Sequence, residues 1–208
     1  MIPSRLHAIL DVDAAERAGW APLDLARAFV SAGAPLIQIR AKHLASAPLL
    51  DLADRLVDIA TAAGASVIVN DRADIARLSA AAGVHVGQED VAPRDARAIV
   101  GPDAIVGYST HTVEQVRAAC AEPVSYIAVG PVFGTNTKDT GYQAVGLDLV
   151  SAAATAAGRI PIVAIGGIKL ENARSVLDAG AAAVAVISDL LRGGDPQGRI
   201  AAYLQALA

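Results

Sequence analysis

Residues 66–87, SVIVNDRADIARLSAAAGVHVG, contain the pattern on which the fold depends. A short β-branched run at 66–70 is followed by an Ala-, Leu- and Arg-rich stretch with helical spacing at 72–81, and a second apolar run begins at Gly83. Strands that alternate with helical stretches are typical of parallel βαβ units. These residues therefore predict one strand–helix–strand unit of a parallel sheet.

The same alternation continues along the whole chain. It predicts strands over 6–10, 36–40, 66–70, 83–87, 104–108, 126–130, 160–165 and 183–187, and helices over 23–32, 48–63, 72–81, 92–100, 113–120, 147–157, 170–179 and 196–207. Eight such units predict an α/β protein, a single (β/α)₈ TIM barrel over residues 1–208. A doubly wound open sheet is the alternative, but the first strand ends in Leu10-Asp11-Val12-Asp13 without a glycine-rich loop.

The composition excludes several classes of protein. A hydrophobic fraction of 54% and a charged fraction of 18% are those of a folded chain, and a net charge of −4 argues against nucleic-acid binding. The apolar runs are far shorter than the roughly 18 residues of a membrane span, and the N-terminus lacks a signal-peptide pattern. A single cysteine, Cys120, suits a reducing compartment, so we expect a cytoplasmic protein without a membrane partner.

In such barrels the chemistry lies at the carboxyl ends of the strands. At the end of the second strand, Gln38, Arg40 and Lys42 alternate and therefore share the barrel-facing side. Cations inside a barrel are costly unless they reach the open mouth or meet an anion. A salt-bridged rim and an anion site both satisfy that condition, and the alternation favours the anion site.

Two aspartates, Asp71 and Asp90, follow the third and fourth strands. Mg²⁺ prefers such carboxylate oxygens together with water and phosphate, although Asp71 could instead cap the next helix. Beside the basic residues, the pair indicates a metal–diphosphate pocket. His85 lies within an apolar strand, which favours a hydrogen-bonded core histidine.

The fifth strand ends in Ser109-Thr110-His111. Ser109 could bind a phosphate or cap the helix at 113, and His111 could be a base or, as we favour, a rim residue. The long polar loop at 130–141 carries Thr135, Thr137 and Lys138, which favours a substrate-binding lid over a solvated surface loop.

Glycine and serine follow the last two strands, in Gly166-Gly167 and in Ile187-Ser188. Loops at these places commonly bind phosphate through backbone N–H groups, and glycine allows a close approach. The sequence thus predicts one backbone site for a monophosphate and one cationic site for a metal-bound diphosphate. Two phosphorylated substrates in one barrel mouth indicate group transfer.

Seven segments in the same order resemble the thiamine phosphate synthase family. They are 38–42, 70–72, 83–90, 107–111, 130–138, 165–168 and 186–188. The resemblance implies a (β/α)₈ barrel that joins a thiazole phosphate to the diphosphate of aminomethylpyrimidine methanol, with thiamine phosphate and pyrophosphate as products.

The resemblance also implies roles for individual residues. Those implied for the pyrimidine diphosphate are Gln38, Arg40, Lys42, Asn70, Ser109 and Lys138, of which Arg40, Ser109 and Lys138 act on the leaving group. Those implied for the thiazole phosphate are Thr135, Thr137, Gly167, Ile187 and Ser188. Asp71 and Asp90 are implied as ligands of Mg²⁺.

Two positions depart from the family pattern, because Ala41 stands where Glu is frequent and Ala82 where Asp is frequent. A related branch, the thiazole tautomerases, shares the barrel but tends to lose the Gln-x-Asp and Thr-x-Thr-Lys features that this chain keeps. A third possibility is a non-catalytic barrel that binds thiamine-related phosphates. A homo-oligomer is possible in each case.

Overall fold

The computed structural model describes residues 4–134 and 144–208, and the strands in this part of the chain form a closed parallel barrel. Each strand pairs with the next, and β8 closes the ring on β1, with Ala8 opposite Val186. The strands are β1 (Leu6–Asp11), β2 (Leu36–Arg40), β3 (Ser66–Asn70), β4 (Gly83–Val86), β5 (Ile105–Thr110), β6 (Tyr126–Val129), β7 (Ile162–Ile165) and β8 (Ala183–Val186). The barrel prediction is confirmed, and the open-sheet alternative is wrong.

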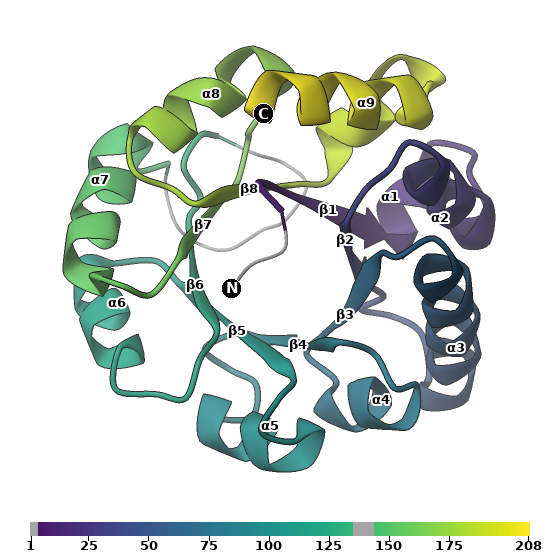
Figure 1. Ribbon diagram of the computed structural model, residues 1–208, viewed down its shortest axis with the longest axis horizontal. Coiled ribbons are helices and arrows are strands. Elements are labelled where there is room, and N and C mark those ends of the chain that lie inside the picture. The colour runs from purple at the N-terminus through teal and green to yellow at the C-terminus, as the bar shows by residue number, and fades with distance from the viewer. Residues whose placement is uncertain (1–3, 135–143) are drawn as a thin grey trace.

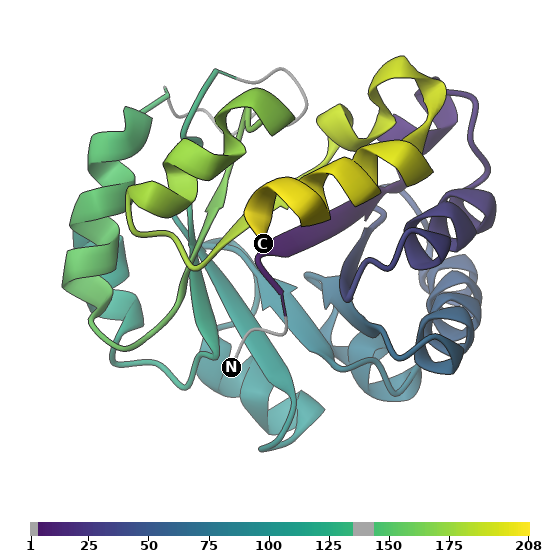
Figure 2. The same ribbon diagram turned by 45° about the horizontal axis from the view of Figure 1, so that its top comes forward.

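The helices lie outside the ring of strands (Figure 1). They are α1 (Val12–Arg17), α2 (Pro22–Ser31), α3 (Ser46–Ala62), α4 (Ala73–Leu78), α5 (Pro93–Val100), α6 (Val113–Ala119), α7 (Gly146–Ala157), α8 (Leu170–Asp178) and α9 (Pro196–Leu207), with a 3₁₀ segment η1 (Ser188–Gly194). The last helix, α9, packs against both α8 and α2 and so completes the helical layer (Figures 1 and 2). None of the helices in the described ranges is long and apolar enough to cross a membrane.

Alternation along the strands divides the core into two layers. One set of side chains, including Ile39 and Val69, packs outward beneath the helices. The other set, including Ile9, Ile68 and Tyr126, fills the barrel interior. Inward-facing residues at the carboxyl ends of the strands lie above this interior layer, and they form the floor and walls of the site.

The sequence pattern misplaces some boundaries. β5 continues two residues beyond the predicted 104–108, because Thr110 pairs with Val129 and its hydroxyl donates to the carbonyl of Ala128 (2.8 Å). Ser109 therefore lies within a strand. The pattern also does not predict α1 or η1, which are short and follow directly on strands.

Candidate active site

A pocket of about 1250 Å³ lies at the carboxyl ends of the strands. Ten of the thirteen predicted site residues line it: Gln38, Arg40, Lys42, Asn70, Asp71, Asp90, Ser109, Gly167, Ile187 and Ser188. The other three, Thr135, Thr137 and Lys138, lie outside the described residues. The structure therefore brings together every predicted site residue that it describes.

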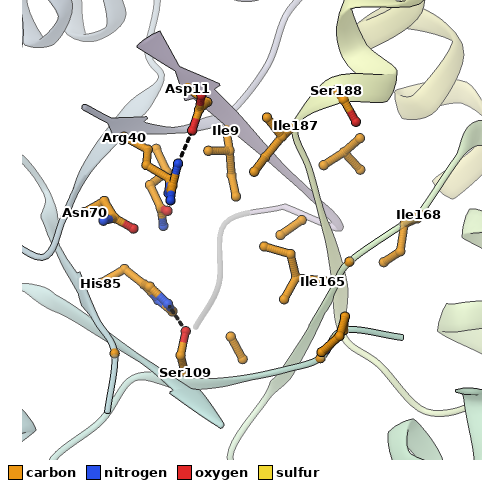
Figure 3. A pocket seen from close by; sticks show the side chains of 18 of the residues that line it. Ile9, Asp11, Arg40, Asn70, His85, Ser109, Ile165, Ile168, Ile187 and Ser188 are labelled. Carbon is orange, nitrogen blue, oxygen red and sulfur yellow. Dashed lines mark hydrogen bonds and ion pairs between the residues drawn. The ribbon is translucent and has the colours of Figure 1, made fainter. Parts of the chain in front are cut away.

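Arg40 at the end of β2 is paired with Asp11 at the end of β1 (Figure 3). The two residues are opposite each other in the register of the strands, and the Asp11 side chain is only 3% exposed. Asp11 also accepts a hydrogen bond from the backbone N–H of Ala14 (2.8 Å) and so caps α1. Asp11 is a site residue that sequence reasoning missed, and it holds the Arg40 guanidinium in place.

Lys42, Asp71 and Asp90 form a second charged group on the same wall. Lys42 is ion-paired with Asp71, and an Asp90 oxygen accepts from the backbone N–H of Gly87 (2.7 Å). Burial raises the pKa of Asp71; the hydrogen bond from Lys42 lowers it, but the neighbouring Asp90 carboxyl adds to the rise, and the net shift is upward. The carboxyl groups of Asp71 and Asp90 are therefore close enough to repel each other. Two carboxylates that bind the same cation have to lie this close together.

Asp71 does not cap the next helix, so that alternative is wrong. The N-cap of α4 is Arg72, and no side chain caps the helix there. Asp71 instead has a positive φ of 64°, and its backbone N–H donates to the carbonyl of His85 (2.7 Å). This left-handed conformation, uncommon outside glycine, accompanies a carboxylate that lines the pocket.

Ser109 belongs to a hydrogen-bonded chain that runs from the pocket into the barrel. Its hydroxyl lies 2.8 Å from Nε2 of His85, and Nδ1 of His85 lies 2.8 Å from the hydroxyl of Tyr126 (Figure 3 for the first contact). His85 is 8% exposed, so the prediction of a hydrogen-bonded core histidine is confirmed. The capping alternative for Ser109 is wrong, because Thr112 caps α6 (3.2 Å to the N–H of Gln115).

Gln38 and Asn70 face the barrel interior beside the hydrogen-bonded residues Ser109 and His85. Gln38 is buried, and its amide nitrogen lies 3.4 Å from Nε2 of His7. Asn70 stands opposite His85 in the register of β3 and β4. The polar groups on this side of the pocket thus come from five adjacent strands, β1 to β5 (Figure 3).

The opposite side of the pocket combines apolar side chains and glycines with the polar side chains of Lys169, Ser188 and Arg192. Ile165, Ile168, Ile187 and Ser188 lie there (Figure 3). Gly167 has a φ of +64°, and a Cβ atom on it would lie 2.6 Å from the carbonyl oxygen of Gly134. Glycine is therefore required for this loop to pack against Gly134, near the start of the connection between β6 and α7, and Gly166 and Gly167 both line the pocket.

Asp189 anchors the loop that carries Ser188. Burial raises the pKa of Asp189, but hydrogen bonds from Tyr203 and Arg199 outweigh that effect and hold it below its ordinary value. Its Oδ2 atom accepts from the Tyr203 hydroxyl (2.6 Å), from Arg199 (2.6 Å) and from the N–H of Leu170 (3.1 Å). Sequence reasoning missed Asp189, whose role depends on α9.

His111 lines the pocket at its rim. Its Nδ1 atom lies 2.6 Å from the carbonyl oxygen of Gly130, so this nitrogen carries the proton, since a carbonyl only accepts. The backbone N–H of His111 donates to Gln115 (2.6 Å). His111 therefore joins the ends of β5 and β6, which agrees with the rim interpretation.

Comparison with known proteins assigns this chain to a family. The family model "Thiamine monophosphate synthase" matches residues 9–190. A thiamine-phosphate synthase of Acidothermus cellulolyticus is 44% identical over 200 residues, which cover 96% of this chain and 93% of that protein. One of Koribacter versatilis is 49% identical over 142 residues, 68% of this chain and 66% of that protein.

A solved structure gives the same result. A thiamine phosphate pyrophosphorylase from Pyrococcus furiosus superposes with a TM-score of 0.87 at 28% identity, over 98% of this chain and 95% of that chain. The resemblance that the seven sequence segments indicate is thus confirmed over nearly the whole barrel. The chain belongs to the thiamine monophosphate synthase family.

Proposed function

We propose that the chain is a transferase that joins 4-amino-2-methyl-5-hydroxymethylpyrimidine diphosphate to 4-methyl-5-(2-phosphoethyl)thiazole, or its carboxylate. The products are thiamine phosphate and pyrophosphate, with carbon dioxide as a further product from the carboxylate. The observation that carries the proposal is the presence of two different walls in one pocket. Arg40, Lys42 and two carboxylates form one wall, and the glycine loop with Ser188 forms the other. The first suits a metal-bound diphosphate and the second a monophosphate.

Mg²⁺ is the ion that we propose for Asp71 and Asp90. Mg²⁺ takes oxygen ligands and commonly uses one or two carboxylates, with water and phosphate oxygens completing its shell. Asp71 and Asp90 both line the pocket, and two carboxylates fit this mode. The raised pKa of Asp71 beside Asp90 indicates a pair that a cation would stabilise. When bound, Mg²⁺ would supply positive charge against the diphosphate.

The residues of the chain fit a displacement in which the diphosphate departs first. The C–O bond to the diphosphate breaks at the methylene beside the electron-rich aminopyrimidine, and the thiazole nitrogen then forms the new C–N bond. Negative charge develops on the leaving diphosphate, where Arg40, Ser109 and Lys138 would donate hydrogen bonds. Ile9, Ile165 and Ile187 line the pocket and would limit access of water to the reactive methylene.

A product assay tests the proposal. The purified protein is mixed with both substrates and Mg²⁺, and thiamine phosphate and pyrophosphate are measured, with each component omitted in turn. Equal amounts of both products, only in the complete mixture, are expected. Release of pyrophosphate without thiamine phosphate, or no product, would overturn the proposal. A cytoplasmic location and a homo-oligomer stay predictions.

A further inference from the structure

Tyr126 is buried at the centre of the barrel, below the pocket. His85, Gly107 and Tyr126 stand opposite one another in the register of β4, β5 and β6. The Tyr126 side chain reaches across β5 to His85 because the β5 residue between them, Gly107, has no side chain. A Cβ atom on Gly107 would lie 2.1 Å from Cζ of Tyr126 and 2.5 Å from Nδ1 of His85. The contact between Tyr126 and His85 therefore depends on this glycine.

The direction of the hydrogen bond between Tyr126 and His85 follows from what each group can do. The phenol is 1% exposed, and His85 Nδ1 is its only hydrogen-bond partner within the described part of the chain. If Nδ1–H donated to the phenol oxygen, the phenolic proton would have no acceptor, and an unsatisfied buried donor is costly. If the phenol donates, its oxygen takes part in a hydrogen bond and no proton is left without an acceptor. Tyr126 therefore donates to Nδ1. Burial raises the pKa of Tyr126, so the phenol keeps this proton throughout the neutral range.

Because Tyr126 donates to His85, the positions of the protons on His85 and Ser109 follow. A neutral imidazole carries one proton, so a His85 ring that accepts at Nδ1 is protonated at Nε2. Nε2–H then donates to the oxygen of Ser109 (2.8 Å). The hydroxyl proton of Ser109 is not used by His85 and remains for an acceptor in the pocket, which Ser109 lines.

We propose that Tyr126 is a positioning residue that acts through His85 to make Ser109 a hydrogen-bond donor towards the diphosphate. This inference rests on the proposed function, because the acceptor is the leaving group of that reaction. The opposite direction would make Ser109 donate to His85, as a serine nucleophile donates to its base. The tyrosine thus excludes a base role for His85 towards Ser109 and retains a donor for the developing negative charge.

The first experiment reads the proton positions directly. In ¹⁵N NMR spectra of the wild-type protein, with the His85 signals assigned from His85→Gln, we expect Nε2 protonated and Nδ1 unprotonated. In Tyr126→Phe the preference for this tautomer is lost. A wild-type ring protonated at Nδ1 would overturn the inference. This measurement needs no activity, so it distinguishes failure of the inference from failure of the proposed function.

The second experiment is a double-mutant cycle with Ser109→Ala. Tyr126→Phe should lower kcat about threefold to tenfold, the size of one net hydrogen bond, while KM for the thiazole phosphate changes less than about twofold. In the Ser109→Ala background the same substitution should change kcat by less than about twofold. An equal loss in both backgrounds would assign Tyr126 to packing alone. Tyr108→Phe, on an outward-facing tyrosine of β5, is the matched control and should retain wild-type turnover.

Discussion

Asp11 and Arg40 stand opposite each other in the β1–β2 register, and one Asp11 carboxylate oxygen pairs with the Arg40 guanidinium while the other caps α1. The carboxylate thus connects the cationic wall of the pocket to the first helix. Because Asp11 is almost fully buried, it has little freedom, and it restricts Arg40 to one direction. Arg40 is presented to the pocket by this pairing rather than by its own strand alone.

Substitutions of Asp11 should separate its pairing with Arg40 from its capping of α1. Asp11→Asn retains an oxygen that can cap α1 but removes the charge, and we expect kcat to fall about tenfold or more as Arg40 loses a charged hydrogen bond. Asp11→Ala should lose activity similarly and, in addition, about 1 kcal/mol of unfolding free energy from the missing cap. Steady-state kinetics and urea unfolding of both variants test this. Wild-type kcat in Asp11→Asn would contradict the orienting role.

How much of this site is predictable from the sequence depends on whether a contact lies within one strand or between strands. Alternation alone places Gln38 and Arg40 on the inner face of β2, and apolar runs locate the strand ends. The Asp11–Arg40 pair depends on the register of β1 against β2, which no local pattern specifies. Tyr126 looks like a core residue in the sequence, and its contact with His85 exists only because Gly107 lies between them in the barrel.

Local signals also mislead at two places. Ser109 precedes a helix and looks like a cap, but β5 continues to Thr110 because its ladder with β6 extends there, so Thr112 becomes the cap. Asp71 also precedes a helix, yet its backbone N–H bonds to His85 of the neighbouring strand and the residue takes a positive φ. In both places, pairing between strands outweighs the preference of short polar residues for helix N-termini.

The carboxylate pair gives a prediction about metal. Asp90→Asn should abolish formation of thiamine phosphate while circular dichroism remains that of the wild type, and excess EDTA should have the same effect on the wild-type protein. The reason is that the leaving diphosphate would lose the ion that stabilises its charge. Asp103→Asn, at an exposed aspartate before β5, is the control and should stay active. Full turnover of the wild-type protein in excess EDTA would contradict the proposal that Asp71 and Asp90 bind Mg²⁺.

Lys138 gives a prediction from the sequence alone, since it lies outside the described residues. If it donates to the leaving diphosphate, Lys138→Ala should lose about 2–4 kcal/mol of transition-state stabilisation, by analogy with the loss of an oxyanion donor. Measurement of kcat with saturating substrates tests this. A decrease of less than about tenfold would assign Lys138 to the solvated surface of its loop.

Substitution of His111 should lower turnover much less than substitution of Asp90 or Lys138. It donates to the Gly130 carbonyl, and the proposed displacement requires no proton transfer from the protein. We expect His111→Gln to retain at least about a tenth of the turnover, a loss of no more than roughly 1.4 kcal/mol. The wild-type protein should also show no Mg²⁺-independent isomerisation of the thiazole carboxylate. If His111→Gln were as inactive as Asp90→Asn with its fold intact, the rim assignment would be wrong.

Because His7 is buried in the barrel interior, we expect the fold to lose stability in acid. Its ring is 1% exposed, its Nδ1 atom has no hydrogen-bond partner among the described residues, and burial lowers its pKa from 6.5 to about 4. Between these two values the unfolded chain binds a proton that the folded chain does not, so stability decreases as the pH falls through this range. The full difference corresponds to about 3 kcal/mol.

Urea unfolding at about pH 7 and about pH 4 measures this contribution. His7→Leu removes the titrating group and also the contact of His7 with the Gln38 amide, which lowers the stability equally at both pH values. The decrease in stability between the two pH values should therefore be about 3 kcal/mol smaller in His7→Leu than in the wild type. His43→Gln is the control, because His43 is exposed and its removal should leave the wild-type decrease unchanged. Equal decreases in His7→Leu and the wild type would show that other groups account for the acid sensitivity and that His7 does not remain neutral in the folded barrel.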